Sequence, residues 1–91
     1  MTKIAKKITV KGMVQGVGYR YYAYTLAKQY EIKGYALNHY NGTLEVLAVG
    51  EEMMLNDFIE QLKHGPAKSK VDDLSVEEVK EMPDSQTFEI K

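Results

Sequence analysis

The chain has 91 residues, a net charge of −1 and no cysteine. This length suits one domain with a single modest core, and the lack of cysteine excludes disulfides, thiolate nucleophiles and cysteine-ligated metals. No apolar run reaches the roughly 18 residues that cross a membrane, and residues 1–10 lack the apolar segment of a signal peptide. We therefore expect one domain, residues 1–91, in the reducing cytoplasm.

The first strand and the first helix follow from hydrophobic periodicity. Ile8 and Val10 alternate with polar residues, which predicts a strand that ends near residue 13 or 14. Apolar and aromatic residues then recur at helical spacing, so we expect a helix over residues 19–31 that Gly34 closes. Tyrosines at such spacing pack in a core more often than they bind a ligand, and we interpret Tyr22 and Tyr30 as packing residues.

Two strand-like runs, residues 35–40 and 43–49, are joined by Asn41-Gly42. Asn-Gly between such runs predicts a β-hairpin with a type I′ turn, because that turn needs positive φ at both central residues. The two strands are then antiparallel neighbours.

The second half of the chain repeats the pattern of helix and strand. Helical spacing predicts a helix that opens near Glu51 and ends after His64, where Gly65-Pro66 follows. Residues 67–73 are polar and are expected to form a connector, and residues 74–79 form a fourth strand. A short edge strand over residues 87–90 ends the chain.

The order strand, helix, strand, strand, helix, strand predicts an α+β fold. Two right-handed crossovers around an internal hairpin give a ferredoxin-like split βαβ sandwich, an antiparallel sheet with two helices on one face. This architecture serves many functions, so function must come from a site.

The glycine-rich stretch from Gly12 to Arg20 is the strongest candidate for a site. A glycine-rich turn before a helix exposes main-chain N–H groups that bind anions, above all phosphate. The helix start lacks a Ser, Thr, Asp or Asn cap, and Arg20 places a cation at the positive end of the helix dipole. A bound oxyanion would satisfy the N–H groups and pair with the guanidinium. The alternative is that water meets these amides and Arg20 extends to solvent.

Charge is unevenly spread along the chain. Residues 1–33 hold seven basic residues and one acid, and residues 34–91 hold five basic residues and twelve acids. A small anion would meet a favourable field near the first segment, although we interpret its lysines mainly as solvating residues.

Other kinds of site find little support. Neither a P-loop nor a dinucleotide-binding motif is present. His39 and His64 have no spaced cluster of ligands around them, so we interpret both as surface residues and expect no metal. The pairs Asp72-Asp73 and Glu77-Glu78 are strand neighbours that point to opposite faces, which favours solvated edge charge over acid–base chemistry.

Two motifs carry a resemblance to a known family. The stretches GMVQGVGYR (12–20) and GYALNHYNG (34–42), followed by Gly50, resemble both signatures of the acylphosphatases, small enzymes with a ferredoxin-like fold. The resemblance extends through Gly65-Pro66 to the ending Phe88-Glu89-Ile90 and so spans nearly the whole chain. Three residues depart from the family pattern. Leu37 stands where the family often has a basic or polar residue, Asn41 where Asp is common, and Leu44 where Val is usual.

The resemblance implies a cofactor-free hydrolase that cleaves acyl phosphates to a carboxylate and inorganic phosphate. It implies that Arg20 binds the phosphate and that Asn38 orients the attacking water. The main chain of five residues would complete the phosphate cradle: Gln15, Gly16, Val17, Gly18 and Tyr19. We expect a monomer with a small-molecule acyl phosphate as substrate, no metal, and no nucleic-acid or membrane partner.

Two alternatives belong to other functional classes. The domain could retain the anion site only to bind a ligand or a protein. An RNA-recognition sheet shares the topology, but the net charge of −1, a first strand without stacking aromatic residues and the absence of an RNP1 motif disfavour it.

Overall fold

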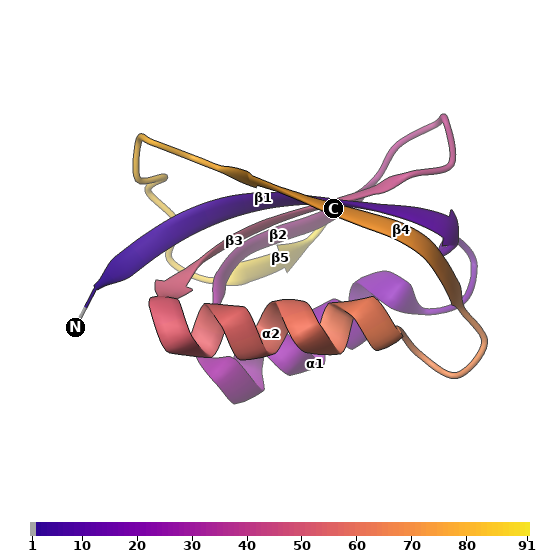
Figure 1. Cartoon of the computed structure of the whole chain (residues 1–91), viewed down its shortest axis with the longest axis horizontal. Coiled ribbons are helices and arrows are strands. Elements are labelled where there is room, and N and C mark those ends of the chain that lie inside the picture. The colour runs from indigo at the N-terminus through magenta and orange to yellow at the C-terminus, as the bar shows by residue number, and fades with distance from the viewer. Residues whose placement is uncertain (1) are drawn as a thin grey trace.

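A computed structural model describes residues 2–91, so Met1 of the predicted domain lies outside the described residues. The molecule has two layers, a five-stranded sheet and two helices that cover one face of it (Figure 1). In chain order the elements are β1 (Lys3–Met13), α1 (Tyr19–Tyr30), β2 (Lys33–Asn38), β3 (Leu44–Glu51), α2 (Glu52–His64), β4 (Lys70–Glu78) and β5 (Phe88–Ile90).

The strand order is β4-β1-β3-β2-β5. The first four strands pair antiparallel, which confirms the split βαβ sandwich expected from the order of the elements. The terminal strand β5 runs parallel to β2, so the complete sheet is mixed.

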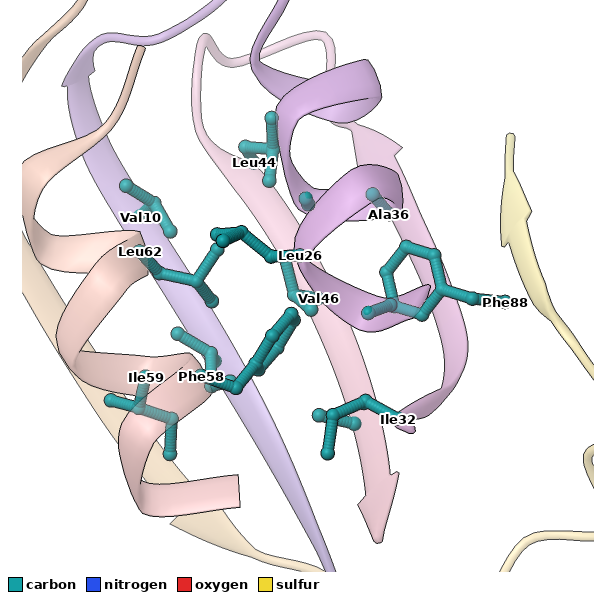
Figure 2. Close-up of a cluster of buried hydrophobic side chains, with 14 of the residues drawn as sticks. Val10, Leu26, Ile32, Ala36, Leu44, Val46, Phe58, Ile59, Leu62 and Phe88 are labelled. Carbon is teal, nitrogen blue, oxygen red and sulfur yellow. The ribbon is translucent and has the colours of Figure 1, made fainter. Parts of the chain in front are cut away.

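Alternate residues of the sheet and one stripe of each helix form the core. Phe58 of α2 and Phe88 of β5 meet edge to face, with ring centroids 6.2 Å apart, between the helices and the sheet (Figure 2). Burying each large apolar side chain contributes roughly 1.5–3 kcal/mol relative to exposure, so this layer stabilises the fold. The predicted packing role of Tyr22 and Tyr30 is confirmed, since both pack against the core cluster.

Two strands are longer than their periodicity predicts. β1 begins at Lys3 and not near Ile8, because it pairs with β3 as far as Glu51. β4 begins at Lys70, so the expectation of a connector over residues 67–73 is wrong for its second half. Val71 and Leu74 of this edge strand pack against the core, but the pairing with β1 shifts register between Lys11 and Gly12. The shift leaves two acidic residues between the two apolar ones, so the sequence shows no regular alternation.

The ending of α1 also differs from the expectation. The helix stops at Tyr30, and Glu31 takes the left-handed conformation (φ 58) while its N–H bonds the carbonyl of Ala27. Gly34 lies inside β2, where a Cβ would collide with the carbonyl of Leu47. This glycine therefore allows close approach of β3 and does not close the helix.

The β2–β3 hairpin is confirmed, but its predicted type I′ turn is wrong. The N–H of Gly42 donates to the carbonyl of His39 (3.1 Å), and the N–H of His39 donates to that of Thr43 (2.9 Å). Gly42 has positive φ whereas Asn41 does not. This pattern is a longer loop built on a type I turn that ends in a left-handed glycine.

Candidate functional site

The connection between β1 and α1 has the geometry expected of an anion-binding loop. Gly16 and Gly18 have φ of 74° and 78°, and a Cβ placed on either would meet nothing within 4 Å, so the loop borders open space. Gly18 occupies the N-cap of α1 without a side-chain cap bond, and the first turn holds no acid. The leading N–H groups of α1 therefore have no side-chain acceptor within residues 2–91, as the sequence predicts.

A cavity of about 170 Å³ joins this loop to the end of β2. The structure brings Arg20 and Asn38 together here, although they come from different elements. Sequence reasoning missed Tyr21 and Ile90, which are both exposed and line the same cavity. The complete lining consists of Val14, Gly16, Gly18, Tyr19, Arg20, Tyr21, Asn38 and Ile90.

Arg20 is held in place by the C-terminal segment. Its Nη1 donates to the main-chain oxygen of Lys91 (2.8 Å), and the N–H of Lys91 donates to the carbonyl of Ala36 (2.9 Å). This contact uses one donor of a guanidinium fork that carries several. The guanidinium is therefore oriented by Lys91, which directly follows strand β5, and keeps donors for a ligand. Lys91 lies outside both sequence motifs, and no sequence pattern points to it.

Asn38 ends β2 with an unusual side chain. Its Oδ1 is buried and has no hydrogen-bond partner among residues 2–91. A buried acceptor without a partner costs about 1–3 kcal/mol, so native proteins rarely keep one outside a functional site. The side chain lines the cavity beside Arg20 and Gly18.

Three predicted cradle residues use their side chains elsewhere. Gln15 donates to main-chain oxygens of the hairpin, and Val17 packs against the core. Tyr19 is 1% exposed, and its hydroxyl donates to the carbonyl of Leu62. Burial, and then the neighbouring Tyr22, raise the pKa of the Tyr19 hydroxyl, so it stays a neutral donor. Only the main chain of these residues is available to an anion.

A polar cluster braces the hairpin on the sheet face away from the helices. Both Tyr35 and His39 bond the carboxylate of Glu45, His39 at 2.8 Å. Burial, then the bond to Glu45 and its charge, raise the pKa of Tyr35 to about 12. Burial alone would raise the pKa of Glu45, but the two hydrogen bonds and the charges of Lys7 and His39 together lower it. His39 is thus a structural partner, while His64 is exposed as expected.

Glu45→Gln is expected to lower the free energy of unfolding by about 1–2 kcal/mol at neutral pH, because two charge-assisted hydrogen bonds are lost. The folded-state pKa of Glu45 lies below its ordinary value of 4.5, so its stabilisation is present above that pH and is lost as the pH falls through the folded pKa. Urea unfolding between pH 7 and pH 3 measures the difference. Glu89→Gln, at an exposed position of β5, is the control; equal effects of the two substitutions would contradict the prediction.

Other features of the described residues do not add to the site. A hollow of about 720 Å³ lies at the ends of α1 and β3. None of the predicted site residues lines this hollow. Within residues 2–91, no three His, Asp or Glu side chains are grouped to hold a metal ion, and no helix is both long and apolar enough to cross a membrane.

Comparisons with known proteins all point to one family. The family model described as Acylphosphatase matches residues 6–90. An acylphosphatase of Photobacterium profundum is 41% identical over 91 residues and is matched over the full length of both chains. An acylphosphatase of Vibrio vulnificus is 42% identical over 74 residues, which cover 81% of this chain and 82% of the relative. The crystal structure of acylphosphatase from Bacillus subtilis superposes with a TM-score of 0.94 at 38% identity, covering 97% of this chain and 98% of that one.

Proposed function

Because the chain belongs to the acylphosphatase family, and is therefore an enzyme that hydrolyses acyl phosphates, we propose that the cavity between the β1–α1 loop and Asn38 is its active site. Arg20 binds the phosphoryl group, and Asn38 places the attacking water. The observation that carries this assignment is the meeting of three features in one cavity: an uncapped helix start, an oriented guanidinium and a buried amide oxygen that has no hydrogen-bond partner in the described part of the chain.

The phosphoryl group binds where α1 begins. Main-chain N–H groups of residues 15–19 and the positive end of the α1 dipole favour an anion, and Arg20 grips two of its oxygens. The left-handed glycines 16 and 18 keep this side of the loop free of side chains, so the main chain can approach the phosphate closely. Because these groups are fixed before substrate arrives, they stabilise charge on the phosphoryl oxygens without reorganisation.

Asn38 positions the water molecule that attacks phosphorus. Because Asn38 lines the cavity, its side-chain amide can accept a hydrogen from a water molecule there, and a lone pair of that water is then free to face phosphorus. The leaving group is a carboxylate, whose conjugate acid has a pKa of about 4–5, so no protein acid is needed to protonate it. The water forms the new P–O bond as the acyl P–O bond breaks, and its proton passes to a phosphoryl oxygen. The products are a carboxylate and inorganic phosphate, and no cofactor takes part.

Release of inorganic phosphate from benzoyl phosphate by the purified protein tests the function. Turnover with competitive inhibition by inorganic phosphate is the expected result. Protection of the protein against heat by phosphate, without turnover of benzoyl, acetyl or carbamoyl phosphate, would assign the domain to ligand binding instead.

The remaining expectations form part of the same proposal. The chain acts as a single domain of residues 1–91, as a monomer in the cytoplasm, on a small-molecule acyl phosphate and without nucleic acid. Large apolar side chains that are exposed, such as Tyr40 and Met53, are scattered over different elements, which supports a monomer.

A further inference from the structure

We propose that the side chain of Gln15 is a positioning residue that holds Asn38 in register with the phosphate cradle. The inference rests on the proposed function and goes beyond it, since Gln15 entered that function only through its main chain. Its side chain neither lines the cavity nor approaches Arg20 through any hydrogen bond of the described residues.

The contact is a clamp between two segments that are distant in sequence. The Nε2 of Gln15 donates to the carbonyl of His39 at 2.6 Å and to that of Thr43 at 3.0 Å, which lie 24 and 28 residues away. The same Thr43 carbonyl also accepts the N–H of His39 at 2.9 Å. One half-buried amide from the β1–α1 loop therefore joins both strands at the mouth of the hairpin.

The carbonyls that accept from Gln15 belong to the two residues next to the cross-strand pair that contains Asn38. Asn38 pairs across the strands with Leu44. His39 directly follows Asn38, and Thr43 directly precedes Leu44. By holding both carbonyls, Gln15 fixes the distance between the last residue pair of the hairpin and the loop that contains Gly16 and Gly18. A catalytic group displaced by about 1 Å can cost a factor of roughly one hundred in rate.

This geometry separates the role of Gln15 from phosphate binding. Both hydrogens of its amide are used by the hairpin, and the main-chain N–H groups and Arg20 remain to bind the anion. Loss of the clamp should therefore lower kcat while the inhibition constant of inorganic phosphate stays nearly constant.

Gln15→Met tests the inference, because methionine keeps the length of the side chain and removes its donors. We expect kcat for benzoyl phosphate to fall about 10- to 100-fold, with the Ki of inorganic phosphate changed by less than about threefold. Gln15→Asn, which keeps the amide on a shorter side chain, should show the same split and replaces the first variant if that one does not fold. Gln29→Met makes the same chemical change at an exposed position of α1 and should leave both constants unchanged.

A double-mutant cycle distinguishes positioning from a general structural role. If Gln15 acts through Asn38, then Gln15→Met should have little further effect on kcat in an Asn38→Ala background. Additive losses would overturn the inference, as would a rise in phosphate Ki that matches the loss of kcat, or a lower melting temperature with unchanged kcat. A wild-type protein that releases no phosphate would instead overturn the proposed function.

Discussion

Arg20→Ala is expected to lower kcat/KM for benzoyl phosphate by roughly two to four orders of magnitude. The guanidinium is the cationic group of the cavity, and its hydrogen bond to Lys91 fixes its direction before substrate binds. Its loss removes both binding of the phosphoryl group and stabilisation of the charge that develops on it. Steady-state kinetics should therefore show a lower kcat together with a higher Ki for inorganic phosphate.

Lys28→Ala is the matched control, because Lys28 is an exposed cation on the same helix, in its last turn. It should leave kcat/KM within about twofold. Arg20→Lys tests the fork geometry, since lysine keeps the charge but cannot bind two oxygens in parallel. Activity near the wild-type level in Arg20→Ala would show that the guanidinium has no part in the reaction.

Asn38→Ala is expected to reduce kcat by a similar two to four orders of magnitude, but with a different signature. The substitution removes the acceptor that orients water and leaves the cradle and Arg20 intact, so the Ki of inorganic phosphate should change little. Because Oδ1 makes no hydrogen bond within residues 2–91, the melting temperature should stay within a few degrees of the wild type.

Asn56→Ala, at an exposed position of α2, provides the control for the same chemical change. It should alter neither kcat nor Ki. A variant of Asn38 that loses phosphate affinity in proportion to its kcat would mean that the amide binds the phosphoryl group directly, and the water would then need another partner.

The periodicity of the sequence is enough to predict the sandwich, because apolar residues with periods of 2 and 3.6 lie on faces that must be buried together. It fails where tertiary contacts decide the conformation. The first part of β4 places only Val71 against the core, and a register shift in its pairing with β1 interrupts the alternation that would identify a strand. The helix ends with Glu31 in the left-handed conformation, which is unfavourable for a residue with a Cβ, and the next residue, Ile32, is buried in the core.

The residues of the candidate site also fall into two groups, those that local sequence patterns predict and those that depend on tertiary contacts. The glycines and the uncapped, arginine-bearing helix start have a local physical meaning, so the loop can be found from the sequence. An isolated Asn just before a hairpin predicts a turn residue, and only the two motifs together indicate a catalytic role for Asn38. The contributions of Ile90 and Lys91 depend on β5 lying parallel to β2, which no local pattern encodes.

Strand β4 is the outer strand on one side of the sheet, next to β1 (Figure 1). An outer strand leaves main-chain N–H and C=O groups that a second molecule could pair with, which makes it a template for aggregation. Two carboxylates near each end of this strand, on Asp72, Asp73, Glu77 and Glu78, are exposed. Pairing of two copies along this edge would bring like charges together, and the repulsion between these carboxylates would oppose it.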